Sequence, residues 1–150
     1  MNISLREINN VNWEECICLT TNKDGRHTLF EEFVASNALS IAQAKIEGGW
    51  NIKGIYNEDK MVGFTMYGYC YENQFYEICR LMIDHRYQGK GYGKVALSMV
   101  IDEMKRYKDC NEIILSFDPK NEIGKKLYES FGFKNTGKII DGELVYSLDI

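Results

Sequence analysis

Apolar and polar residues follow recognisable periods along the first half of the chain. Alternation predicts strands, and apolar residues three or four apart predict helices. A helical pattern over residues 28–47 ends at Gly48-Gly49, a pair that terminates helices. The elements expected in this half are a strand at Ile3–Leu5, a helix at residues 11–20, one long or two short helices at 28–47, and a hairpin of strands 51–56 and 61–71.

Strand and helix patterns alternate in the second half. Leu97, Val100, Ile101 and Met104 share one face of a helix, which is expected to pack on a sheet. The other elements expected are a strand at 75–83, a strand at 112–117 that ends at Asp118-Pro119, a short helix through Ile123, Leu127 and Phe131 that Gly132 ends, and a terminal hairpin of 133–139 and 143–150 around Asp141-Gly142.

Three glycines at alternate positions separate the strand at 75–83 from the next helix, in the segment Gln88–Lys94. Glycine permits positive φ and close approach of the backbone, so successive N–H groups can point into one concavity. The positive end of the helix points to the same place, and Arg86, Lys90 and Lys94 flank it. This pattern predicts a loop that binds phosphate groups.

Composition restricts the class of protein. The chain has 150 residues, which fits one domain with a full core, and a net charge of −4. That charge disfavours a nucleic-acid-binding protein and favours a cationic partner. No segment resembles a signal peptide or a membrane span, so we expect a cytoplasmic protein with no membrane partner. The five cysteines contain no C-x-x-C pair, and His27 and His85 lack metal-ligand spacing, so reduced cysteines and no metal site are expected.

Three interpretations of the glycine loop follow from its residues alone. Gly91-x-Gly93-x-x-Ala96 fits the dinucleotide fingerprint, with Asp118 placed to bind a ribose. A doubly wound dinucleotide domain needs further strand–helix units, however, and only residues 119–150 remain. The Walker pattern fails because Val95 stands where Ser or Thr is required. A turn that binds no ligand is the third interpretation. Three glycines lose much conformational entropy on folding, and packing alone compensates for little of that loss.

A second motif follows the next strand. Asn121-x-x-Gly124-x-x-Leu127-Tyr128-x-x-x-Gly132-Phe133, taken with Gln88-x-x-Gly91-x-Gly93, resembles the two signature motifs of the GNAT superfamily of N-acetyltransferases. The order of elements is also similar to that fold. The resemblance implies an α/β (α+β) chain with a single GNAT domain over residues 1–150, a mixed central sheet, helices on both faces and a βαβ core around the glycine loop. Gly124 departs from the family, which usually has alanine there.

The resemblance also implies that acetyl-CoA is the co-substrate. Its pyrophosphate would lie on the amides of the glycine loop, and its pantetheine arm would pair with the preceding strand and contact Asn121. The cofactor-binding residues implied are Leu81, Met82, Ile83, Gln88, Gly89, Lys90, Gly91, Tyr92, Gly93, Lys94 and Asn121.

Two residues are candidates for catalysis. The resemblance assigns Tyr128 to protonation of the leaving thiolate, with an ordinary core aromatic as the alternative. Glu77 is the candidate base, because related histone acetyltransferases carry their catalytic glutamate in this strand. Strand alternation would put Glu77, Cys79 and Leu81 on one face, which is then the substrate side. A solvated glutamate near the strand end is the alternative for Glu77.

The acceptor depends on the N-terminal half. The segments Phe33–Ala44 and Val62–Gly68 resemble the bacterial spermine/spermidine acetyltransferase branch, which implies a polyamine substrate. A net-acidic surface would attract such a polycation, and Glu31, Glu32 and Glu77, with Tyr67 or Tyr69, could bind it. Another amine, such as an aminoglycoside, a diamine or a protein N-terminus, and a non-catalytic acyl-CoA-binding module are the alternatives. The exposed last strand could support a homodimer.

Overall fold

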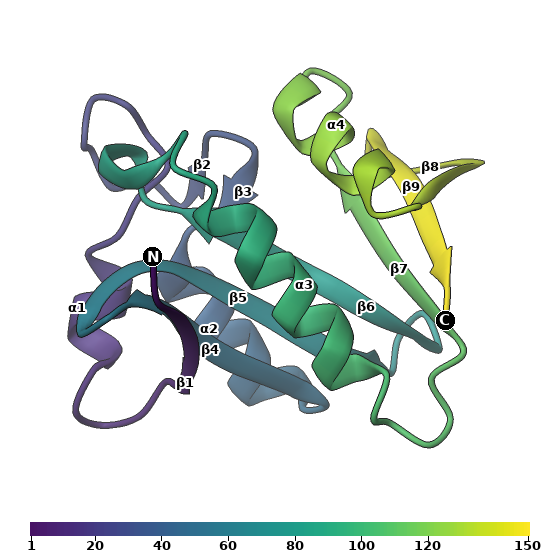
Figure 1. Ribbon diagram of the computed structural model, residues 1–150, viewed down its shortest axis with the longest axis horizontal. Coiled ribbons are helices and arrows are strands. Elements are labelled where there is room, and N and C mark those ends of the chain that lie inside the picture. Colours follow the sequence, from purple (N-terminus) through teal and green to yellow (C-terminus); the bar gives the residue numbers. More distant parts are fainter.

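The computed structural model describes residues 1–150 (Figure 1). The strands are β1 (Ile3–Glu7), β2 (Phe30–Glu31), β3 (Val34–Ala35), β4 (Trp50–Asn57), β5 (Lys60–Cys70), β6 (Phe75–Ile83), β7 (Glu112–Phe117), β8 (Lys134–Ile140) and β9 (Glu143–Asp149). The helices are α1 (Trp13–Ile17), α2 (Asn37–Glu47), α3 (Tyr92–Met104) and α4 (Glu122–Ser130), with a 3-10 turn, η1, at His85–Tyr87.

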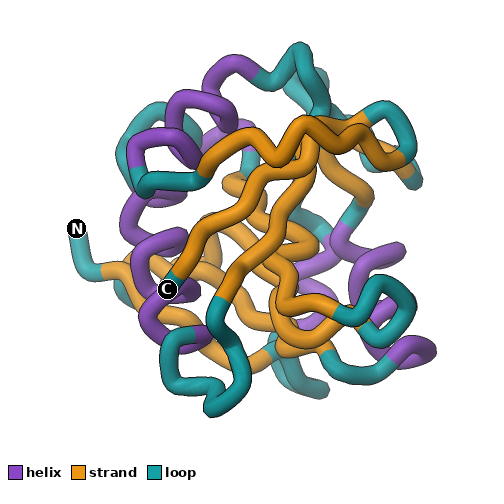
Figure 2. The backbone as a smooth tube through the Cα atoms, turned by 90° about the vertical axis from the view of Figure 1, so that its right-hand side faces the viewer, coloured by secondary structure: helices purple, strands orange, loops and turns teal.

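Seven strands form one mixed sheet in the order β1-β4-β5-β6-β7-β9-β8. Every neighbouring pair is antiparallel except β6 and β7, which are parallel and joined by α3. Apolar residues of α3 pack on one face, and residues of α1 and α2 pack on the other (Figure 2). The expected fold class, a mixed sheet with helices on both faces and a βαβ core around the glycine loop, is therefore confirmed.

The helices expected before residue 37 are wrong or too long. Residues 30–35 form the two-stranded ribbon of β2 and β3, with Phe33 between them at a φ of +64°. Helix α2 begins only after Ser36, whose side-chain oxygen accepts a hydrogen bond from the Leu39 amide. Helix α1 has five residues rather than ten, and soon after it the Thr20 amide donates to the buried carboxylate of Asp84.

A β-bulge in β6 changes which residues share a face. Met66 of β5 lies opposite Arg80, but the next residue, Tyr67, lies opposite Ile78, so Cys79 has no partner. Glu77 and Cys79 face the α2 side, whereas Leu81 packs against residues of the α3 side. The expectation that Leu81 shares a face with Glu77 and Cys79 is wrong, because the bulge interrupts the alternation of the strand.

Strands β6 and β7 touch at one end and diverge at the other. Only one residue pair, Glu77 opposite Ile114, is in register between them. Beyond that pair the C-terminal ends of β6 and β7 separate, as the ribbon shows (Figure 1). This divergence opens the sheet next to the glycine loop. None of the helices is long and apolar enough to cross a membrane.

Candidate active site

A cleft of about 420 Å³ occupies the opening between β6 and β7. It is lined by the end of β6, the glycine loop, the start of α3, the end of β7 and the side of α4 that carries Gly124 and Tyr128. Tyr128 and all the expected cofactor-binding residues except Lys90 line this cleft. The structure therefore brings together the two motifs that lie about thirty residues apart in the sequence, and the cleft is large enough for a small-molecule ligand.

The end of β6 presents a free backbone edge to the cleft. Leu81, Met82 and Ile83 pair with β5 on one side, and no residue of β7 is in register with them on the other. On that open side the Ile83 carbonyl accepts a hydrogen bond of 3.0 Å from the Gln88 side chain. Unpaired N–H and C=O groups on a strand edge can bind an extended ligand as an additional strand does. The arm of a pantetheine group, which carries two amides, has this chemistry.

The glycine loop lines the same cleft. Gly89 and Gly91 have φ values of +77° and +84°, which residues other than glycine rarely adopt. Gly91 is also the N-cap of α3, so the amides that follow it in the first turn of the helix have no partner within the helix. Together these groups form a site suited to phosphate oxygens. Lys90 does not line the cleft, and its Nζ lies 5.8 Å from the centre of the Tyr87 ring.

The buried residue Asp84 fixes the backbone at the start of this loop, a role that the sequence did not indicate. Its carboxylate accepts hydrogen bonds from the Thr20 amide (3.0 Å), the Arg86 amide (3.0 Å) and the Arg86 Nε (2.8 Å). Burial alone would raise the pKa of Asp84, but the hydrogen bonds from Arg86 and Thr20 keep that pKa below its ordinary value. The sequence signal was an acid at the end of an apolar strand, followed two residues later by arginine.

Asn121 serves as the N-cap of α4, and Gly124 makes this arrangement possible. The Asn121 Oδ1 accepts a hydrogen bond of 2.9 Å from the Gly124 amide. A Cβ added at Gly124 would lie 2.6 Å from the Asn121 Nδ2, so the alanine usual in the family would displace this side chain. Asn121 lines the cleft beside Tyr128, which is the location expected for a contact with the cofactor arm.

Tyr128 is half-buried at the wall of the cleft and packs near Phe117 and Phe133. Its hydroxyl makes no hydrogen bond within the protein. Burial, and next the charge of Glu143, raise the pKa of Tyr128 to about 12. The phenol therefore stays protonated at neutral pH and can donate a hydrogen bond or a proton to a group in the cleft.

A second cavity of about 570 Å³ adjoins the first and is strongly acidic. Phe33, Val34, Cys79, Arg80 and Ser116 line both cavities, so the two are continuous. Seven carboxylates and a single cationic side chain, that of Arg80, line the second one. The carboxylates belong to Glu31, Glu47, Glu72, Glu77, Asp118, Asp141 and Glu143. Cations are attracted to such a cavity, and anions are repelled.

Glu77 is partly buried in this acidic cavity. Burial is the main cause that raises the pKa of Glu77 to about 7, and the charges of Glu143 and Glu47 add to it, while Arg80 opposes the shift. A carboxyl group that titrates near neutral pH can accept a proton and release it again. The alternative of a fully solvated glutamate is not supported.

Arg80 is held against α2 rather than aimed at the carboxylates. Its Nε donates to Ser40 Oγ (3.1 Å), its Nη2 to Gln43 Oε1 (2.9 Å) and its Nη1 to the Cys79 carbonyl (2.9 Å). Because these acceptors are neutral, Arg80 forms no ion pair, and the excess of negative charge in the cavity remains available for a ligand.

The expected substrate-binding residues lie in different places. Glu31 lines the acidic cavity, with its carboxylate also accepting hydrogen bonds from Thr20 Oγ1 and the Thr21 amide. Glu32 lines the cleft between β6 and β7. The expectation for Tyr67 is wrong, because this side chain is completely buried on the α3 face and its hydroxyl donates to Glu103. Tyr69 lines neither of the two cavities.

Sequence reasoning missed most of the acidic cavity. The sequence indicates Asp141 only as part of a turn, and Asp118 only as the end of a strand or a ribose-binding acid. In the structure, the tip of the β8–β9 hairpin brings Asp141 and Glu143 to the cavity, and Glu143 accepts a hydrogen bond of 3.1 Å from Ser116 Oγ. The residues come from five separate segments, so no local motif could have indicated them.

The opened mixed sheet, the free edge of β6 and the loop of unpaired amides define an acyl-CoA-dependent transferase. The sequence matches the Acetyltransferase (GNAT) family over residues 6–133, and the chain belongs to that family. It is therefore an enzyme of the class that transfers the acetyl group of acetyl-CoA to amines. The dinucleotide-binding interpretation of the glycine loop is wrong.

Among curated proteins, the chain is 34% identical over 137 residues to the spermine/spermidine N(1)-acetyltransferase of Bacillus subtilis, covering 81% of this chain and 90% of that protein. The fold is similar to PaiA N-acetyltransferase of Thermoplasma acidophilum in complex with coenzyme A, at a TM-score of 0.74, 18% identity and full coverage of both chains. It is also similar to spermidine N-acetyltransferase of Vibrio cholerae in complex with CoA and spermine, at a TM-score of 0.71 and 19% identity, covering 99% of this chain and 95% of that one.

Proposed function

We propose that this enzyme acetylates a primary amine of a linear polyamine of the spermidine or spermine kind. The observation that carries the proposal is the acidic cavity, which is lined by seven carboxylates and one arginine and adjoins the cleft between β6 and β7, named the cofactor cleft from here on. Phe30, Phe33 and Trp50 also line it, and aromatic faces bind ammonium groups and their methylene chains. The curated relative from Bacillus subtilis supports the same substrate class.

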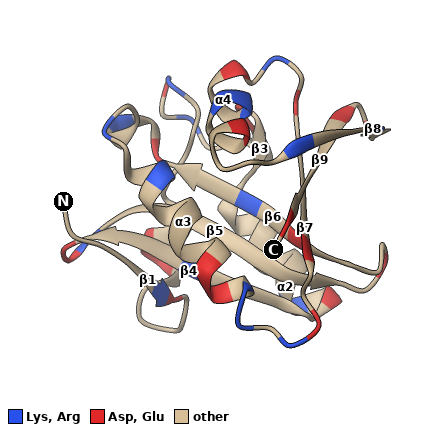
Figure 3. Ribbon diagram, turned by 45° about the vertical axis from the view of Figure 1, so that its right-hand side comes forward, with Lys and Arg blue, Asp and Glu red and all other residues tan.

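The cofactor cleft would hold acetyl-CoA as the co-substrate. The amides around Gly89 and Gly91 would bind its pyrophosphate, and the edge of β6 at Leu81–Ile83 would bind its pantetheine arm. Lys23 and Lys94, the second at the start of α3, line this cleft and complement a polyanion. Figure 3 shows basic residues at the start of α3 and also on α4. The thioester would then lie toward Tyr128, at the side where the two cavities join.

Glu77 would make the acceptor amine reactive. An alkylammonium group has a pKa of about 10 and cannot attack until it loses a proton. Ionised Glu77 accepts that proton, directly or through a water molecule, and passes it to solvent. The neutral nitrogen then attacks the carbonyl carbon of the thioester, so that a C–N bond forms as the C–S bond breaks.

Tyr128 would complete the transfer by protonating the leaving thiolate. Its hydroxyl has no partner within the protein, and its raised pKa keeps it protonated before the reaction. The second N–H proton, which is lost as the amide forms, restores the Tyr128 hydroxyl. The products are one N-acetylated amine and free CoA, and one proton is released overall.

A thiol-release assay with a panel of acceptors tests the proposal. We expect kcat/KM to be highest for spermidine or spermine, lower for putrescine, and lowest for a peptide N-terminus and an aminoglycoside. The Asp141→Asn and Glu143→Gln variants should raise KM for spermidine several-fold, whereas Glu58→Gln, in an exposed turn outside the cavity, should not change it. A peptide or aminoglycoside that is preferred over every polyamine would overturn the proposal.

A further inference from the structure

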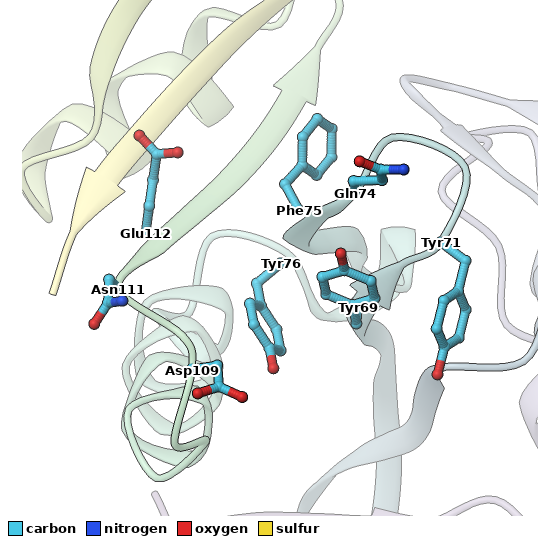
Figure 4. A pocket seen from close by; sticks show the side chains of 8 residues that line it. All are labelled: Tyr69, Tyr71, Gln74, Phe75, Tyr76, Asp109, Asn111 and Glu112. Atoms are coloured by element: carbon cyan, nitrogen blue, oxygen red, sulfur yellow. The ribbon is translucent and has the colours of Figure 1, made fainter.

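A third cavity, of about 590 Å³, lies at the opposite end of β6 from the glycine loop (Figure 4). It is lined by the end of β5, the β5–β6 turn, the start of β6 and the segment that leads into β7. Its lining residues are Tyr69, Tyr71, Gln74, Phe75, Tyr76, Asp109, Asn111 and Glu112. None of them lines the cofactor cleft or the acidic cavity, so this cavity is separate from the active site.

Aromatic rings form a large part of its wall, and they stand at steep angles to one another. The Tyr69 ring lies 5.2 Å from that of Tyr71 at 76°, and 5.1 Å from that of Tyr76 at 70°. Tyr107 stacks on Tyr76 at 5.6 Å and supports it from the side of α3. These edge-to-face contacts hold the three rings in one cluster that lines the cavity, and aromatic rings attract an organic cation that lies over a face.

The charges around the cavity have one sign. Asp109 and Glu112 are the only ionisable groups with a charge at neutral pH among its lining residues, and both are exposed. Figure 4 shows the Tyr76 hydroxyl and the Asp109 carboxylate on the same side of the cavity. The faces of aromatic rings are also negative, so the rings and the carboxylates favour a positive ligand and disfavour an anion.

We propose that this cavity is a second ligand site, which binds a small organic ammonium ion against the cluster of Tyr69, Tyr71 and Tyr76, with Asp109 and Glu112 balancing its charge. The ligand is bound and not acetylated there, because no part of the cofactor cleft borders the cavity. The proposal does not depend on which amine the active site accepts.

Choline and its neutral isostere 3,3-dimethylbutanol provide the test, since choline is a quaternary ammonium ion and has no N–H bond that could be acetylated. We expect choline at millimolar concentration to shift the NMR amide signals of Gln74, Phe75 and Asn111, and the neutral isostere to shift them much less. The Tyr71→Ala and Asp109→Asn variants, both changes of exposed side chains, should each weaken choline binding by roughly three- to tenfold.

Two controls separate this site from the active site. Asp141→Asn, a change in the acidic cavity, should leave the choline-induced shifts of Gln74 and Asn111 unaltered. Tyr71→Ala should leave acetyl transfer to spermidine unaltered. Absence of shifts at these amides, equal shifts with the neutral isostere, or choline affinity unaffected by both Tyr71→Ala and Asp109→Asn would each overturn the proposal, whatever amine the enzyme acetylates.

Discussion

At the scale of single residues, burial prepares the two candidate catalytic groups for opposite roles. It raises the pKa of Tyr128 to about 12, which keeps the phenol protonated, and it raises the pKa of Glu77 to about 7, which lets the carboxylate exchange protons. Glu143 raises both values further through its charge. A pair of groups with separated pKa values is what an acid and a base in one site require.

We expect Tyr128→Phe to lower kcat by roughly ten- to a thousandfold, because a general acid contributes on this scale. The ring would still pack near Phe117 and Phe133, so the fold and the affinity for acetyl-CoA should stay as in the wild type. Steady-state kinetics and calorimetry measure the two quantities. Tyr146→Phe, which removes a hydroxyl bonded to Glu129, is the matched control. An unchanged kcat would exclude the proposed role of Tyr128.

The pH dependence of turnover tests Glu77. In the wild type, kcat/KM should rise with pH through about 7 as this carboxyl group ionises. Glu77→Gln should lose roughly ten- to a hundredfold in kcat/KM near neutral pH and less in alkali, where the free amine becomes abundant. Full pH–rate profiles of both proteins provide the measurement. A ratio of the two rates that is the same at every pH would indicate that Glu77 positions the amine instead.

Glu77 should also reduce the stability of the protein at neutral and higher pH. Its pKa in the folded state is about 7 against an ordinary value of 4.5, so the folded state binds the proton more tightly and stability falls as pH rises between these values. Urea denaturation of Glu77→Gln should give a free energy of unfolding about 1–3 kcal/mol above that of the wild type at about pH 8, and equal to it at about pH 4. A variant less stable than the wild type at both pH values would contradict this.

The site residues that the sequence identified belong to local motifs, whereas those that it did not identify have hydrogen-bond partners remote in the sequence. Asn121 and Tyr128 belong to a local motif on one helix, and the cleft brings them to the glycine loop as the motif implies. Glu143 and Asp84 depend on segments remote in sequence, namely Ser116 for the first and Thr20 for the second. Tyr67 was assigned by residue type, and its partner Glu103 on α3 could not be identified from the strand alone.

At the scale of elements, the glycine loop can be tested by its backbone conformation. Gly91→Val should abolish detectable binding of acetyl-CoA in calorimetry, because a φ of +84° is strained for valine and the loop amides would move. Gly137→Val is the matched control, since Gly137 has a φ of +82° with open space around it and lines none of the three cavities. Normal acetyl-CoA binding by Gly91→Val would exclude a role of this loop in binding the cofactor.

Long elements with a periodic apolar pattern were predictable, whereas the short strands β2 and β3 and the β-bulge in β6 were not. The patterns of α3, β5 and β7 each extend over a whole element that packs on the core, so spacing and structure agree. The ribbon of β2 and β3 has two residues per strand, too few to show a period, and its apolar residues matched helical spacing by coincidence. The bulge at Cys79 depends on the partner strand β5, whose register no local pattern specifies.

At the scale of the whole molecule, one topological feature creates the candidate site. Strands β6 and β7 are the only parallel neighbours in the sheet, and their divergence opens the cofactor cleft beside the acidic cavity. The motifs implied the fold and the cofactor, but they did not predict a cavity assembled from β6, α2 and the β8–β9 hairpin. That cavity exists only after the C-terminal hairpin has joined β7.

The acidic cavity predicts that the dependence of kcat/KM on salt concentration differs between acceptors. With acetyl-CoA saturating, kcat/KM for spermine should fall by roughly tenfold between about 0.05 M and about 0.5 M NaCl, because salt screens the attraction between the polycation and the seven carboxylates. A monoamine such as butylamine should lose less than about twofold over the same range, since it carries one charge. The kcat at saturating spermine should stay constant, because salt weakens the binding of spermine and does not affect the chemical step. If both amines lost activity in the same proportion, the acidic cavity would not be what selects the substrate, and the selection would have to come from shape alone.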